Sequence, residues 1–211
     1  MPEREPKDSF LEVFLSGIDV STRLETASPG FPRNVEAFID LVENTLSAGE
    51  GNFRIYFHPR NYMSYTFIGT IEAYEHEAHI VYDRNRSMCW RRFIVVKEMC
   101  HLLFASHGQK HLASTPEQIG QLVTKILAGL ENVDISRDHI SSTETCTVFM
   151  ALEVLMPHSE REKVNRMMQE GGSVLDVATY YRVPSQMVGL YLNEEYVRMM
   201  KEAYKCAGRL S

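Results

Sequence analysis

The sequence predicts an α+β fold with a small three-stranded sheet, an active-site helix and a mostly helical C-terminal part. Residues 53–57, 65–71 and 78–82 are rich in β-branched and aromatic side chains, which is typical of strands. On both sides of them, apolar residues recur every three or four positions, which is the spacing of amphipathic helices. A chain of 211 residues is long enough for one core, or for one core with a small appendage.

Two helices are expected before the sheet. Apolar residues at positions 10–18 predict a short helix, which ends at the Ser-Pro-Gly turn signal of residues 28–30. A clearer apolar stripe predicts a helix over residues 34–47. We therefore expect residues 1–33 to form an N-terminal arm that contains a short helix.

The second half of the chain is expected to be helical. A strong start signal, TPEQ, opens a predicted helix over residues 115–130. Further helices are expected over residues 142–156 and 159–169, and the last region predicts two or three helices that break at residues 183–185. These patterns predict one domain over residues 34–157 and a helix-turn-helix-like extension over residues 158–211 that packs on it.

The stretch RRFIVVKEMCHLLF, residues 91–104, has the pattern of a zinc-protease helix that lacks one ligand. In an HExxH helix, two histidines four residues apart bind the metal, and the glutamate after the first is the general base. Glu98 and His101 stand at the positions of the base and of the second ligand. Lys97 stands at the first-ligand position, and its ammonium has three donors and no lone pair. The pattern predicts a site that keeps the general base and one metal ligand and has lost the other helix ligand.

Three blocks of the sequence, in this order, resemble the ImmA/IrrE family of zincin-like metallo-endopeptidases. They are HIVYDRNRSMCWRRFIVVKEMCHLLF, then ETCTVFMALEVLMP, then DVATYYRVPSQMVGLYL. The resemblance covers roughly residues 34–192. It implies a zincin-like domain in which two helix histidines and a later glutamate hold zinc. It also implies that the motif glutamate activates a water molecule and that the substrate is a helix-turn-helix repressor.

Carried over residue by residue, the resemblance makes Glu98 the general base and His101 a metal ligand. The third ligand falls on Glu144, which would preserve a carboxylate, or on Cys146, whose thiolate would bind zinc well. Lys97 departs from the family pattern. We expect its ammonium to take the place of the metal ion and to pair with Glu98 and Glu144, because buried carboxylates without a cation would be costly.

This site favours a catalytically impaired regulatory domain that binds a protein partner, by resemblance a helix-turn-helix repressor or a similar protein. No cofactor is favoured. The alternative is an active zinc-dependent metallo-endopeptidase with a nonstandard ligand set. The connection from His101 to Cys146, which contains the helix predicted over residues 115–130, is longer than expected of the family, and the added helix would lie beside the cleft.

The charge of the chain bears on a third alternative, a DNA-binding regulator that uses the C-terminal helices. The net charge of −6 and the isoelectric point near 5.8 disfavour nucleic acid and anionic membranes as partners. Residues 173–211 are nearly neutral, whereas neutralising DNA phosphates requires a basic face. The chain has no apolar run of bilayer length, no apolar stretch typical of a signal peptide at its start and no CxxC pair. We expect a cytoplasmic protein.

Overall fold

The computed structural model describes residues 6–47, 52–61, 69–104 and 139–209, with the side chains of residues 6–13, 104 and 139–144 outside this description. The described elements form a small sheet and a mostly helical remainder, so the predicted α+β class is confirmed. In chain order they are α1 (Pro6–Ala27), α2 (Val35–Leu46), β1 (Arg54–Arg60), β2 (Gly69–Ala73), β3 (Glu77–Asp83), α3 (Met88–Phe104), α5 (His139–Leu155), the 3-10 helix η3 (His158–Glu160), α6 (Arg161–Gln169), α7 (Val174–Tyr181), α8 (Ser185–Leu192) and α9 (Glu194–Cys206).

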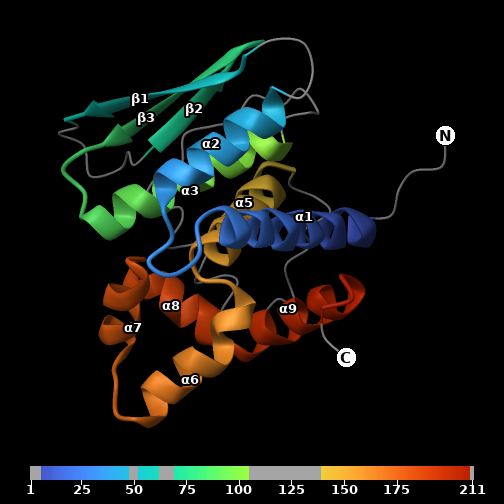
Figure 1. The fold of residues 1–211 in the computed structure, drawn as a ribbon, viewed down its shortest axis with the longest axis vertical. Helices are drawn as coiled ribbons and strands as arrows, with labels where there is room; N and C mark the ends of the chain where they lie inside the picture. The colour runs from blue at the N-terminus through green and yellow to red at the C-terminus, as the bar shows by residue number, and fades with distance from the viewer. Residues whose placement is uncertain (1–5, 48–51, 62–68, 105–138, 210–211) are drawn as a thin grey trace.

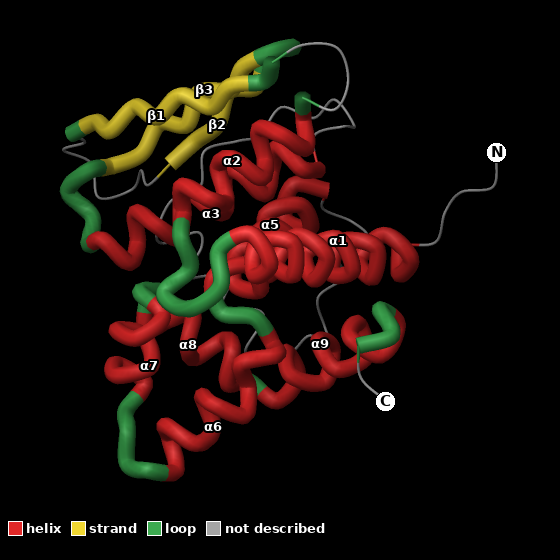
Figure 2. The backbone as a smooth tube through the Cα atoms, in the orientation of Figure 1, coloured by secondary structure: helices red, strands yellow, loops and turns green. Residues whose placement is uncertain are grey.

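The elements are stacked in layers along the long axis of the molecule. Figure 1 shows the sheet at one end, α2 and α3 beneath it, α1 and α5 in the next layer, and α6–α9 at the other end. Figure 2 shows that the described strands lie together at that one end. Helix α3 contacts both the sheet and α5, so its middle lies inside the molecule.

The sheet has the strand order β1–β3–β2, in which β1 is parallel and β2 antiparallel to β3. Ile80 on β3 pairs with Phe57 on β1 and with Ile71 on β2. Side chains alternate between the two faces of a strand, so these apolar residues share one face. That face packs on α2 and α3. Of the strand predicted over residues 65–71, only the part from Gly69 falls within the described residues.

The N-terminal helices form where they were expected, with one difference in length. Helix α2 is capped by Asn34, whose side chain accepts hydrogen bonds from the N–H groups of Glu36 and Ala37. Helix α1 is longer than the apolar pattern predicted and ends just before the expected turn. It packs against α5, where the rings of Phe14 and Phe149 are 5.5 Å apart between centroids.

The C-terminal helices follow the predicted break. Ser173 and Asp176 form a capping box at the start of α7, and Arg182 ends that helix in a left-handed conformation with φ 53°. Pro184 then precedes α8, because proline suits a helix start and not its interior. The Tyr191 hydroxyl donates to the carbonyl of Pro157 over 2.9 Å, which ties α8 to the end of α5.

Two further points concern the extent of the helices. The helix predicted over residues 115–130 lies outside the described residues. Among the helices that are described, none is long and apolar enough to cross a lipid bilayer.

Gly69 begins β2 at a point where the strand lies directly against α3. A Cβ atom at this position would lie 2.4 Å from Cγ2 of Ile94 and 3.5 Å from Oε1 of Glu98. The first distance is far shorter than a van der Waals contact. A glycine is therefore required for β2 to approach α3 this closely beside Glu98.

The first prediction concerns this approach. Gly69→Ala is expected to lower the free energy of unfolding by about 1–3 kcal/mol, since the added methyl group overpacks the contact with Ile94. Gly189→Ala is a matched control, because a Cβ there meets no atom within 4 Å. In helix α8 this change should raise stability by about 0.5–1 kcal/mol. Urea unfolding measures both changes, and equal stability of Gly69→Ala and the wild type would show that β2 does not lie this close to α3.

Candidate functional site

Helix α3 is buried through its middle, and the predicted site residues lie in this stretch. Every residue from position 93 to 102 is buried. The exposed fractions of Lys97, Glu98 and His101 are 0%, 1% and 0%. Because water does not solvate these side chains, their polar atoms require partners inside the protein.

Lys97 lies between the other two residues and contacts both. Its Nζ atom is 3.0 Å from Oε1 of Glu98 and 3.3 Å from Nε2 of His101. Lys97 and His101 are four residues apart, so they occupy the same face of the helix. The second oxygen of Glu98, Oε2, lies 4.0 Å from Nε2 of His101. The expected contact of Lys97 with Glu98, away from bulk water, is present.

The chemistry of these groups fixes the direction of the hydrogen bonds. An ammonium only donates, so a charged Lys97 donates to Nε2 of His101. The same ammonium donates to the Glu98 carboxylate in a charge-assisted hydrogen bond. One cation thus binds a carboxylate and an imidazole in the interior of the protein.

Helix α5 contributes Thr147 to this site. The Thr147 hydroxyl oxygen is 3.3 Å from Nε2 of His101, and the residue is fully buried. The side chain of Glu144 lies outside the described residues, but position 144 is one helical turn before Thr147 and shares its face of α5. Cys146 is turned about 100° from Thr147 around the helix. Within the described residues, Thr147 and not Cys146 is the α5 side chain within hydrogen-bond distance of His101.

The two buried thiols near the site are held in their protonated form. Burial raises the pKa of Cys146 to about 12. Burial also raises the pKa of Cys100, against the opposing effect of the Lys97 charge. Since the thiolate is the form that binds metals and attacks substrates, both residues act as small apolar groups in the core.

The side chain of Lys97 does not fit the position of a zinc ligand. A catalytic zinc needs three protein ligands whose lone pairs point at one position. Lys97 offers hydrogens instead, and its ammonium lies 3.3 Å from the histidine nitrogen that would bind the metal. Among the side chains that the structure describes, no three of His, Cys, Asp and Glu are grouped to hold a metal ion. Lys97 therefore brings its own positive charge to the place where the motif has its first ligand.

Comparisons with known proteins do not assign this chain to a family. No protein-family model matches the chain, and a search of curated proteins finds no significant match. The geometry of the site is therefore the basis for a functional inference.

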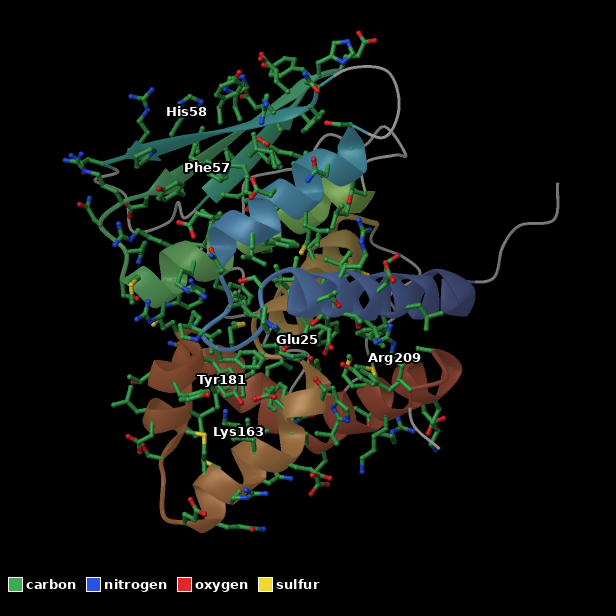
Figure 3. The ribbon with its side chains drawn as sticks, in the orientation of Figure 1. Glu25, Phe57, His58, Lys163, Tyr181 and Arg209 are labelled. Atoms are coloured by element: carbon green, nitrogen blue, oxygen red, sulfur yellow. The ribbon has the colours of Figure 1, made fainter. Side chains whose placement is uncertain are left out.

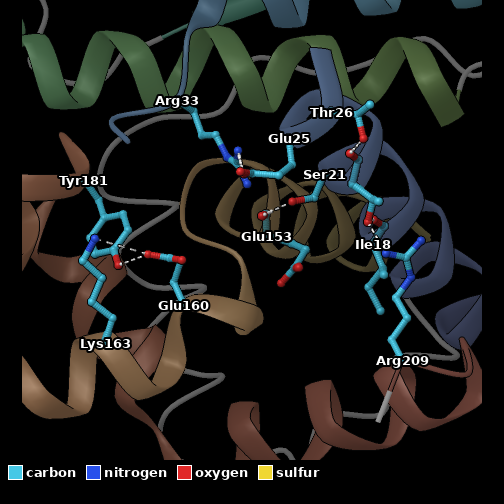
Figure 4. A network of polar contacts seen from close by, with 11 residues as sticks. Ile18, Ser21, Glu25, Thr26, Arg33, Glu153, Glu160, Lys163, Tyr181 and Arg209 are labelled. Atoms are coloured by element: carbon cyan, nitrogen blue, oxygen red, sulfur yellow. Dashed lines mark hydrogen bonds and ion pairs between the residues drawn. The ribbon is translucent and has the colours of Figure 1, made fainter. Parts of the chain in front are cut away.

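A second buried acid lies further along α5, next to the C-terminal helices. The Tyr204 hydroxyl donates to Oε1 of Glu153 over 2.5 Å, and the backbone N–H of His158 donates to Oε2 over 3.0 Å. The Ser21 hydroxyl donates to the backbone carbonyl of Glu153 over 3.1 Å, as Figure 4 shows. Glu153 thereby joins α5 to α1, η3 and α9.

Glu153 and His158, two titratable groups of this cluster, favour their neutral forms. Burial raises the pKa of Glu153 to about 8, although the hydrogen bonds from Tyr204 and His158 and the charge of Arg33 act in the opposite direction. Burial lowers the pKa of His158 to about 4, and the charges of Arg161 and Lys201 add to this effect. At neutral pH the cluster is therefore largely uncharged.

Neither Thr147 nor Glu153 was selected from the sequence, although each has a signal there. Thr147 follows Glu144 by three residues, which is one helical turn. Glu153 is the one charged residue in the apolar run of positions 148–156. A carboxylate in a buried helix indicates a specific internal partner.

The second prediction concerns pH. Between the unfolded pKa of Glu153, 4.5, and its folded pKa of about 8, the folded state holds a proton that the unfolded state has lost. Stability should therefore fall as pH rises through this window, by roughly 2 kcal/mol between about pH 6.5 and pH 8.5. His158 acts in the opposite direction at the lower end of this range, because its unfolded pKa is 6.5 and its folded pKa is about 4. Near pH 6.5 the unfolded state binds part of a proton that the folded state does not, so His158 raises stability with pH by only about 0.4 kcal/mol over the range.

Glu153→Gln removes the titrating group and keeps the size of the side chain, with one amide oxygen left to accept a hydrogen bond. The variant should show little change in unfolding free energy over the same pH range. Urea unfolding at the two pH values tests this. A slope as steep in Glu153→Gln as in the wild type would assign the pH dependence to another group.

Proposed function

We propose that this chain is a zincin-like domain of the ImmA/IrrE type in which the Lys97 ammonium has replaced the metal ion. We further propose that it acts as a regulatory domain that binds a protein partner, a helix-turn-helix repressor or a similar protein. The observation that supports this is the position of Nζ of Lys97, 3.0 Å from Glu98 and 3.3 Å from His101. The order of helix, small sheet, α3 and α5 is also the order that the resemblance implies.

The state of Glu98 supports binding over hydrolysis. A general base must reach the proton that it removes, directly or through one water molecule. Glu98 is 1% exposed, and its Oε1 atom accepts from Lys97. A hydrolytic role would require Lys97 to leave this carboxylate, and the pair would then lose its compensating charge.

The two alternative functions have less support. An active metallo-endopeptidase with a nonstandard ligand set would need the Lys97 ammonium to move away from His101. DNA binding through α8 would need an exposed helix that enters the major groove. Helix α8 instead buries most of its side chains against the rest of the fold, namely Met187, Val188, Leu190 and Tyr191.

The third prediction concerns metal content. Wild-type protein purified without an affinity tag should contain well under one zinc per chain, and chelation should leave its Tm unchanged. Lys97→His should gain zinc affinity, because it restores a lone pair one turn before His101. Lys97→Leu removes the charge without adding a ligand and is the control. A full equivalent of zinc in the wild type, lost on chelation together with stability, would contradict the proposal.

The fourth prediction concerns the stability of the ion pair. Lys97→Ala should lower the free energy of unfolding by roughly 3–5 kcal/mol, because it leaves the Glu98 carboxylate buried without this cation. Adding Glu98→Gln should recover part of the loss, since the orphaned charge is then removed. Lys201→Ala, at an exposed position of α9, should change stability by less than about 0.5 kcal/mol.

Urea unfolding of the wild type, Lys97→Ala, Glu98→Gln and the double variant gives the coupling between Lys97 and Glu98 as a double-mutant cycle. A loss in the double variant equal to the sum of the two single losses would show no coupling. That result would mean that Lys97 does not act as the compensating cation.

A further inference from the structure

Five arginines lie along one edge of the molecule, from the ends of β1 and β3, past the start of α3, to the turn between α7 and α8. We call this surface the arginine face. Figure 1 shows the start of α3 between the sheet and α7, and Figure 3 shows nitrogen atoms gathered along this edge. Its members are Arg60, Arg84, Arg91, Arg92 and Arg182.

Backbone and side-chain contacts hold these arginines near one another. The backbone N–H of Arg84 donates to the carbonyl of Arg60 over 3.0 Å, which places both at the same end of the sheet. A short turn then leads into α3, whose first turns carry Arg91 and Arg92. Nε of Arg92 donates to the carbonyl of Arg182 over 3.4 Å. The arginine face therefore continues from the sheet to the C-terminal helices.

The arginine face differs from five other described arginines in its lack of carboxylate partners. Within the described residues, none of its five members forms an ion pair with an acidic side chain. Nearby, Asp83 is buried and pairs with Arg86. Elsewhere arginines do have acidic partners, in the pairs Arg23–Asp19, Arg33–Glu25, Arg54–Glu43 and Arg198–Glu195.

The positive charges of this surface are also poorly compensated. The chain has 28 acidic and 22 basic residues, so its composition does not predict a basic surface. Burial lowers the pKa of Arg92, and the neighbouring charge of Arg182 lowers it further, against the smaller opposing effects of Cys89 and Glu36. Among the described residues, the buried Nε of Arg91 has no hydrogen-bond partner. A bound anionic group would relieve the repulsion between Arg92 and Arg182.

We propose that the arginine face binds an acidic peptide segment of the protein partner. This inference rests on the proposed role in protein binding and names the chemistry of the partner. A guanidinium forms two parallel hydrogen bonds with a carboxylate, so a row of arginines suits a segment rich in Asp and Glu.

Two features favour a peptide over nucleic acid as the occupant. Met88 is 47% exposed and lies one helical turn before Arg91 and Arg92, so an apolar side chain borders these arginines. Methionine and arginine are both enriched in protein interfaces. The net charge of −6 also repels a long polyphosphate, whereas a short peptide carries few charges.

The test uses the full chain and a fluorescein-labelled peptide of alternating acidic and leucine residues, with fluorescence anisotropy at about 0.15 M salt. Arg60→Glu combined with Arg84→Glu should weaken peptide binding about tenfold or more. The matched control reverses two exposed arginines on other helices, Arg166→Glu and Arg198→Glu. It changes the net charge equally and should leave peptide affinity within about twofold of the wild type. If the first variant loses stability, Arg60→Gln with Arg84→Gln is compared instead.

Three results would overturn the inference: no peptide binding by the wild type, equal weakening in both charge-reversal variants, or tighter binding of duplex DNA of equal charge. Arg60 and Arg84 are not part of the Lys97 site, so these results do not alter the zinc content or the Lys97–Glu98 coupling. A failure here is therefore distinguishable from a failure of the proposed function.

Discussion

Lys97 and Glu98 place opposite charges in the middle of a helix that water does not reach, and the neighbouring elements are arranged around this pair. Removing the two ions from water costs several kcal/mol for each, and their attraction offsets this cost only with good geometry and further hydrogen bonds. His101 and Thr147 supply such polar neighbours. Strand β2 lies close to α3 beside Glu98, because Gly69 has no side chain there. The same helix begins at the arginine face, so α3 joins a buried cation site to an exposed basic surface.

Much of the fold could be predicted because it follows from local chemistry. Asn34 starts α2 by accepting backbone hydrogen bonds, and Pro184 precedes the first residue of α8. Strand positions followed from β-branched and aromatic residues with period two. The length of α1 could not be predicted in this way, because residues 6–9 are mostly polar and add nothing to the apolar stripe. Its packing on α5 depends on contacts between distant parts of the chain.

The candidate site, like the fold, could be predicted from the sequence only in part. Lys97, Glu98 and His101 could be grouped from helical spacing alone, because all three belong to one helix. Thr147 and Glu153 enter through the packing of α5 on α3 and on α9, which is set by tertiary contacts and not by spacing within one segment. When a site is built from several elements, the sequence therefore predicts only those of its residues that lie on the same helix or strand. The consequence of Lys97 is electrostatic: its ammonium supplies a positive charge between Glu98 and His101.

The most direct test of this account is X-ray diffraction from crystals grown with zinc, with data collected at the zinc absorption edge. The account predicts electron density for the Lys97 side chain between Glu98 and His101, and no anomalous peak at the position of a metal bound to His101. An anomalous peak about 2.0–2.1 Å from Nε2 of His101, with Lys97 turned away from Glu98, would contradict it.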